Sequence, residues 1–244
     1  MVGTNVFTVG CSHYEGDGDL TMWTYYGTKK KIAKFYPAPN HDKIIEPFAG
    51  AAQYSLFGEN WKKEVVLYDK YDVVVKIWEY LIGASEKDIL SLPDMNFGDK
   101  IDDHDYLCDA EKYLIGFCIN SGSASPKKTV AKFNCWNRQK LVIANDLYKV
   151  KHWKVYQCNN FDEIPNEDAT WFIDPPYQFG GQYYRHSNKN IDYKNLADWC
   201  LTRIGQIIVC ENTKASWMDF IPLVNLNGQL HKTTEAIFYK EVNP

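Results

Sequence analysis

The 244-residue sequence has no apolar run near the roughly 20 residues that span a bilayer, so we expect no membrane-spanning helix. Its first residues contain no basic segment followed by a long apolar one, and we therefore expect no secretory signal. It also contains no internal repeat and no low-complexity tract. Hydrophobic residues make up 45% of the chain and charged residues 24%, which is ordinary for a globular protein. We predict one soluble, cytoplasmic domain with an insert.

The seven cysteines are scattered, and no two of them form the Cys-x-x-Cys pair that many zinc and redox sites use. Their odd number does not fit a disulfide scaffold, so we expect reduced thiols, as in a cytoplasm. The six histidines are equally scattered, and we interpret each of them as structural or exposed rather than catalytic. The sequence therefore predicts no metal site.

The most informative segment covers residues 171–177 and reads W-F-I-D-P-P-Y. Its apolar start is typical of a buried parallel strand. Pro175 and Pro176 end the strand, because proline cannot donate a ladder hydrogen bond, and they keep the preceding backbone extended. Open α/β sheets bind ligands at the carboxyl ends of their strands. The carboxylate of Asp174, the carbonyl of Pro175 and the ring of Tyr177 would suit a planar ligand with an exocyclic amino group.

Two earlier segments favour a binding site over a plain strand-end turn, which the same four residues could also form. Residues 43–52 are a short apolar strand that runs into small residues, and residues 54–57 open a helix. Small residues at such a turn let a ligand approach the backbone, and a helix amino end offers N–H donors. Residues 64–69 form a second strand that ends in Asp69, the position from which a carboxylate binds ribose hydroxyls in dinucleotide-type folds.

Together these segments resemble the DNA adenine-N6 methyltransferases, in the motif order of the family that includes the bacterial adenine methylase Dam and its phage-borne relatives. Residues 25–29 look like the family's amino-terminal cofactor motif, and residues 46–52 look like its glycine motif. Asp69 matches the ribose-binding acid, and residues 174–177 match the catalytic motif. Residues 158–162 are a weaker match to the segment near the cofactor's adenine.

The resemblance implies S-adenosyl-L-methionine as the cofactor and methyl transfer to the N6 amino group of an adenine that is extruded from the duplex. One departure from the family is Ala52, where many relatives carry glycine, so we expect a narrower cofactor turn. The residues implied in catalysis are Asp174, Pro175, Pro176 and Tyr177. The residues implied in cofactor binding are Tyr25, Lys29, Glu46, Pro47, Phe48, Gly50, Asp69, Phe161 and Asp174.

The pattern of elements predicts an α/β fold with a doubly wound, mostly parallel, Rossmann-like sheet. We expect an irregular amino-terminal arm over residues 1–24 and a methyltransferase domain over residues 25–244. A small helical insert over residues 84–150 is the expected seat of target recognition. Helices are predicted over residues 71–83, 110–120, 136–150 and 193–203. Further strands are predicted over residues 155–158, 171–173, 206–210 and, as a last edge strand, 236–240.

The net charge is −4, but the charges are unevenly distributed along the insert. Residues 85–112 carry nine acids against three lysines, whereas residues 126–154 carry eight basic residues against one acid. A basic stripe of this kind suits a phosphate backbone, although a solvated helix face would give the same pattern. We therefore expect DNA as the partner, with no membrane and no metal. The residues expected to contact DNA are Lys127, Lys128, Lys132, Arg138, Tyr184 and Arg185.

Other functions share parts of this pattern. Cytosine-N4 methyltransferases more often carry serine in place of Asp174, and guanine-N2 methyltransferases of ribosomal RNA usually lack a segment like residues 25–29. An inactive nucleic-acid-binding relative or a non-enzymatic cofactor-binding domain remains a further alternative. A methyltransferase of the implied family would act in a bacterial or phage-infected cell. A cognate restriction enzyme would be a further partner, and the motifs identify none.

Overall fold

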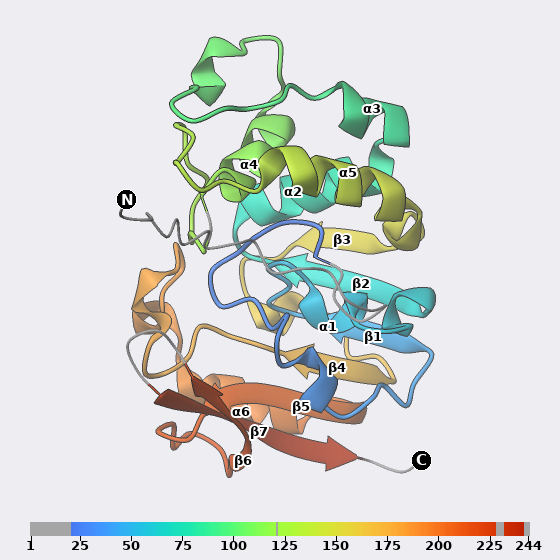
Figure 1. Cartoon of the computed structure of the whole chain (residues 1–244). Helices are drawn as coiled ribbons and strands as arrows, with labels where there is room; N and C mark the ends of the chain where they lie inside the picture. Colours follow the sequence, from blue (N-terminus) through green and yellow to red (C-terminus); the bar gives the residue numbers. More distant parts are fainter. Residues whose placement is uncertain (1–20, 121, 228–231, 242–244) are drawn as a thin grey trace, which may run out of the picture.

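The computed structural model describes residues 21–120, 122–227 and 232–241, and its centre is a seven-stranded mixed sheet (Figure 1). The strand order is β3-β2-β1-β4-β5-β7-β6. The first five of these strands run parallel, β7 runs antiparallel to β5, and β6 runs antiparallel to β7. This confirms an α/β fold with a mostly parallel sheet, compatible with a Rossmann-like architecture. The strands are β1 (Lys43–Glu46), β2 (Glu64–Asp69), β3 (Lys154–Gln157), β4 (Ala169–Ile173), β5 (Gly205–Asn212), β6 (Ile221–Asn227) and β7 (Lys232–Glu241).

The helices follow the predicted order, with local differences. The helix expected over residues 136–150 is α5 followed by a 3₁₀ turn over Leu147–Val150. The helix expected after the glycine turn is only one turn long. The helix amino end that was expected to face a ligand therefore belongs to a very short helix. A short helix that the sequence reading missed, α3, begins with a capping box between Ser85 and Asp88. The helices are α1 (Gln53–Leu56), α2 (Asp72–Gly83), α3 (Glu86–Ser91), α4 (Asp109–Cys118), α5 (Trp136–Asp146) and α6 (Tyr193–Leu201).

The two faces of the sheet pack against different helices, because successive side chains of a strand point to opposite faces. Val65 and Leu67 of β2 belong to the same buried cluster as the apolar side of α2, whereas Val66 packs in the cluster that contains α6. In Figure 1, α2, α4 and α5 lie together next to β3, and β7 and β6 lie at the opposite end of the sheet. The helices therefore leave the carboxyl ends of the central strands available for a site.

The last strand is not the edge strand that the sequence suggested. β7 lies between β5 and β6, and β6, a strand that the sequence reading missed, forms the edge. β6 includes Pro222 and shows a register shift between Pro222 and Val224, both of which are features of edge strands. The last strand of a chain need not be the edge strand of the sheet. In a carboxyl-terminal hairpin either of the two strands can pair with the rest of the sheet, and the other one then forms the edge.

The expected amino-terminal arm is only partly described. Residues 1–20 lie outside the described residues. The next residues include Met22 and Trp23, which are fully buried in the main core. This segment leads directly into the motif at residues 25–29.

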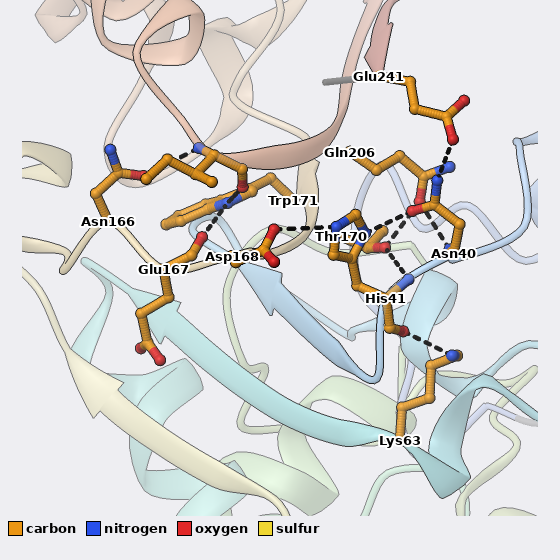
Figure 2. Close-up of polar contacts among 11 residues, drawn as sticks. Asn40, His41, Lys63, Asn166, Glu167, Asp168, Thr170, Trp171, Gln206 and Glu241 are labelled. Atoms are coloured by element: carbon orange, nitrogen blue, oxygen red, sulfur yellow. Dashed lines mark hydrogen bonds and ion pairs between the residues drawn. The ribbon is translucent and has the colours of Figure 1, made fainter. Parts of the chain in front are cut away.

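A network of polar side chains joins the amino ends of β1, β4 and β5 to the carboxyl end of the antiparallel β7 (Figure 2). Gln206 Oε1 accepts hydrogen bonds from the backbone of Asn40 at 3.1 Å and from Thr170 Oγ1 at 2.7 Å. The Asn40 side chain donates to Glu241 at 2.6 Å, and His41 Nε2 lies 3.1 Å from Asp168 Oδ1. These contacts connect the segment before β1 to β4, β5 and β7. This end of the sheet is thus held together by side chains, and the chemistry predicted from the motifs belongs to the other end.

Candidate functional site

A cavity of about 270 Å³ opens at the carboxyl ends of β1, β2 and β4. Strand order reverses between β1 and β4, and such a switch point is where open α/β sheets bind ligands. Every residue predicted to bind the cofactor lines this cavity: Tyr25, Lys29, Glu46, Pro47, Phe48, Gly50, Asp69, Phe161 and Asp174. Segments that are up to about 150 positions apart in the chain therefore share one site.

The glycine turn forms one wall of the cavity and uses left-handed backbone at two positions. Gly50 has φ 46° and Ala52 has φ 45°. Ala52 is the sole residue other than glycine with positive φ in the described part of the chain, and an alanine pays about 1–2 kcal/mol for this conformation. A side chain at Gly50 would meet the ring of Tyr25, since an added Cβ would lie 3.1 Å from it. The turn thus places backbone, rather than side chains, against the cavity.

Asp69 connects the glycine turn to the end of β2. Its Oδ2 accepts a hydrogen bond from the backbone N–H of Gly50 at 3.0 Å, and its Oδ1 accepts one from Tyr71 at 2.8 Å. Burial raises the pKa of Asp69 to about 6, although these backbone donors lower it in part. The backbone of Lys70 also donates to Asp69. A carboxylate has about four acceptor positions, so these three bonds leave capacity for a hydroxyl donor of a ligand.

The catalytic corner predicted from the sequence contains an ion pair. Lys29 Nζ lies 2.8 Å from Asp174 Oδ1 and donates a hydrogen bond to the hydroxyl of Tyr177 at 2.8 Å. Burial raises the pKa of Asp174 to about 6, with Lys29 opposing the shift. Burial alone would lower the pKa of Lys29, but the carboxylates of Asp174 and Glu235 outweigh it and raise that pKa. Lys29 thus pairs with the carboxylate of Asp174 and also lines the cavity.

The other residues of the corner differ in their access to the cavity. Pro176 lines it, together with Tyr184 and Arg185 of the following loop, whereas Pro175 and Tyr177 are not among its lining residues. Tyr177 is half-buried, and Lys29 Nζ lies 4.4 Å from the centre of its ring. The stacking role implied for Tyr177 would therefore require access from outside the cavity seen here.

Two buried acids next to the corner were missed by the sequence reading. Glu235 on β7 lies 3.8 Å from Lys29 Nζ and accepts a hydrogen bond from the hydroxyl of Tyr177. Glu211 at the end of β5 accepts hydrogen bonds from the backbone of Gln178 and from Trp217 Nε1 at 3.2 Å, and so orients the loop after the corner. Glu211 could have been found, since it follows a buried strand just as Asp69 and Asp174 do. No comparable local signal marks Glu235.

The basic stripe of the insert is separate from the cavity, and part of its charge is paired. Lys127, Lys128, Lys132 and Arg138 are exposed and do not line the cavity. The acidic first half of the insert packs against its basic second half through an isolated bridge between Lys100 and Thr129. Four ion pairs involve lysines of the stripe: Lys128–Asp102 at 2.9 Å, Lys140–Asp94 at 2.5 Å, Lys149–Asp146 at 2.8 Å and Lys154–Glu64 at 3.1 Å. The difference in charge between residues 85–112 and residues 126–154 is therefore smaller on the folded surface than the sequence suggested.

Within the described residues no group of three or more histidine, cysteine, aspartate or glutamate side chains could hold a metal ion. Among the same residues, no helix is both long and apolar enough to cross a bilayer. Comparison of the chain with family models and with curated proteins found no match.

Proposed function

We propose that this protein transfers a methyl group from S-adenosyl-L-methionine to the N6 amino group of adenine in DNA. The observation that carries the proposal is the convergence of the cofactor motifs and Asp174 on one cavity at the switch point of the sheet. Strand direction alone brings the ends of β1, β2 and β4 together, but it does not account for residues 25–29 and Phe161, which line the same cavity. The fold alone would not support this function, because similar sheets serve many reactions.

The side chains of the cavity fit the proposed cofactor. Glu46 is buried, Asp69 and Asp174 are half-buried, and the one buried amine among the lining residues is Lys29. Lys70 and Arg185 also line the cavity but are exposed, so the excess of carboxyl groups is confined to its buried part. There it suits a ligand that carries positive charge, as the sulfonium and ammonium groups do. Asp69 has acceptor capacity left for a ribose hydroxyl, and Phe161 offers a ring beside it for an adenine. When bound, the cofactor would supply a methyl group on a cationic sulfur.

The residues of the corner would act mainly by positioning the adenine. Extruding the base from a duplex costs a few kcal/mol, and the protein must offer polar partners to the base in return. Asp174 is an acceptor at the end of a rigid, proline-stiffened strand, and it would accept a hydrogen bond from the amino group. That bond would make the nitrogen lone pair more available for in-line attack on the methyl carbon. The N–C bond would form as the C–S bond breaks, the neutral thioether would leave, and the extra proton of the amino group would pass to Asp174 or to solvent. Correct placement can supply a large part of the acceleration of such a reaction.

The test is to incubate the protein with methyl-labelled cofactor and either unmethylated genomic DNA or ribosomal RNA, and then to identify the labelled nucleoside. The expected product is N6-methyladenine in DNA. Label on cytosine in DNA or on guanine in RNA would assign the site to another base. Cofactor binding without label on either nucleic acid would indicate an inactive relative.

Cofactor affinity is expected to depend on pH. Protonation neutralises the acids of the cavity, whose pKa values burial raises to about 6 for Asp69 and Asp174 and to about 8 for Glu46. A cationic ligand prefers the ionised acids, so its affinity should rise from about pH 5 to about pH 8. Calorimetry over this range measures the slope. S-adenosylhomocysteine, which lacks the sulfonium charge, is the matched ligand and should show a shallower slope; equal slopes for the two ligands would contradict the electrostatic argument.

Replacement of Lys127, Lys128 and Lys132 with glutamine tests the basic stripe. If these lysines contact phosphates, each lost contact should lower the slope of log affinity against log salt by about 0.9. Lys128 already pairs with Asp102, so its share should be smaller than that of Lys127 or Lys132. Sequence preference should survive, because phosphate contacts position a protein and base contacts specify the site. Fluorescence anisotropy at several salt concentrations gives these slopes.

The matched control removes the same charge elsewhere, by changing Lys62, Lys194 and Lys240 to glutamine. Its salt slope should equal that of the wild type. An unchanged slope in the stripe variant would assign the stripe to a solvated face. We would then expect DNA to contact the loop that lines the cavity with Tyr184 and Arg185.

A further inference from the structure

Glu235 is a buried acid with an unusual set of partners. It is 3% exposed and lies on β7, between β5 and the edge strand β6, paired with Asn212 of β5 and with Val224 of β6. Burying a carboxylate is costly unless it is paired and hydrogen-bonded. Its position in the fold directs this acid toward the corner that contains Asp174.

The partners of Glu235 form one chain of hydrogen bonds. Tyr36 donates to Glu235 Oε1 at 2.6 Å, and the hydroxyl of Tyr177 donates to the same oxygen. Lys29 in turn donates to the oxygen of that Tyr177 hydroxyl. Because the hydroxyl of Tyr177 accepts from Lys29 and donates to Glu235, its orientation is set from both sides. Glu235 therefore fixes the orientation of the Tyr177 side chain, which follows the two prolines.

Lys29 is shared between two carboxylates. Its Nζ lies 2.8 Å from Asp174 Oδ1 and 3.8 Å from Glu235 Oε1. In the proposed reaction the Asp174 carboxylate must accept a hydrogen bond from the amino group of the base. In the free protein its Oδ1 is buried beside the charge of Lys29 and has no hydrogen-bond partner among the described residues, so the ion pair holds the carboxylate toward Lys29. A second carboxylate within reach lets Lys29 give up Asp174 without leaving its charge buried and unpaired.

We propose that Glu235 is the positioning residue of the catalytic corner: it retains Lys29 and the Tyr177 hydroxyl while the Asp174 carboxylate turns to the amino group of the substrate. This inference rests on the proposed function, and it adds a residue that no motif contains. Glu235 acts through Lys29 and Tyr177 and contacts no substrate itself.

The test replaces Glu235 with glutamine, which keeps the size of the side chain and removes its charge. Lys29 should then remain on Asp174, so kcat should fall about 100-fold while the dissociation constant of the cofactor changes little. The acidic limb of the pH–rate profile should move to lower pH, because the charge of Glu235 helps to raise the pKa of Asp174. A residue with a purely structural role would not move this limb.

A second readout needs no methyl transfer. Aspartate labelled with ¹³C at the carboxyl carbon reports the titration of Asp174 by NMR, with Asp174→Asn to assign the signal. The titration midpoint should be lower in Glu235→Gln than in the wild type. Besides Lys29 and Glu235, the titratable groups around Asp174 are Tyr36, Glu46, Tyr177, Tyr184, Cys210 and Glu211, all of which both proteins share.

The matched control is Glu241→Gln, the same substitution on the same strand at the opposite end of the sheet, which should leave turnover and the Asp174 titration unchanged. Glu235→Asp, which keeps the charge, should restore the titration and part of kcat. If Glu235→Gln does not fold, Tyr36→Phe removes one donor to the Glu235 carboxylate and changes no charge. This variant should lower kcat with unchanged cofactor affinity; wild-type turnover in it overturns the proposal.

The two proposals can fail separately. An unchanged Asp174 midpoint or a wild-type kcat in a folded Glu235→Gln protein overturns the role of Glu235. A shifted midpoint in a protein whose wild type methylates no nucleic acid overturns the proposed function instead, and leaves the coupling of Glu235 to Asp174 in place.

Discussion

Asp174→Ala is expected to lower methyl transfer by at least about 10²–10³-fold, the usual loss when one preorganised electrostatic contact to the reacting group is removed. Cofactor affinity should fall much less than turnover, because the glycine turn and Asp69 remain in place and only one carboxylate of the cavity is lost. Single-turnover transfer of labelled methyl groups and calorimetry measure the two effects. Near-normal turnover would exclude the mechanism in which Asp174 accepts from the amino group.

The structure adds an expectation about stability. Asp174→Ala removes the nearest partner of Lys29 and leaves that buried amine with Glu235 at 3.8 Å. Loss of one partner from a buried ion pair commonly costs about 3–5 kcal/mol, and Glu235 should reduce the cost here. Asp174→Asn keeps the shape and should be the more stable of the two inactive variants. Asp168→Ala, at the other end of the same strand, is the control that should keep its turnover.

Asp69→Ala is expected to weaken binding of S-adenosyl-L-methionine by about 1.5–3 kcal/mol, the worth of a charge-assisted hydrogen bond. Asp69 also accepts from the backbone of Gly50, so the variant should loosen the glycine turn and lower the thermal midpoint of unfolding. Calorimetry gives the affinity. Asp72→Ala, an exposed acid three residues further on, should leave affinity unchanged, and an unchanged affinity in Asp69→Ala would place the ribose elsewhere.

The convergence of the motifs followed from local sequence. The segments ending in Glu46, Asp69 and Asp174 are each an apolar run that stops at an acid, and buried parallel strands carry their carboxyl ends to one edge of the sheet. Because this rule depends only on strand direction, Glu46, Asp69 and Asp174 could be expected at one edge without knowing the strand order. Tyr25, Lys29 and Phe161, by contrast, were expected there only from the family resemblance. Helix α2 was equally predictable, since Val74, Ile77, Trp78 and Leu81 recur at helical spacing and are all fully buried.

Strand order and the pairing of charges depended on contacts between distant parts of the chain. β7 inserts between β5 and β6, and this placement brings Glu235 to Lys29 and Tyr177. The acids of the insert likewise fold back onto its lysines, as the pair Lys128–Asp102 shows.

The sequence by itself therefore determined which segments reach the ligand edge of the sheet, because periodicity and strand direction are local properties of the chain. The tertiary structure alone decided which buried charges share Lys29 and which lysines of the insert are already paired. The physical reason is that an ion pair depends on a few ångströms of separation between side chains whose positions are set by strand order and register.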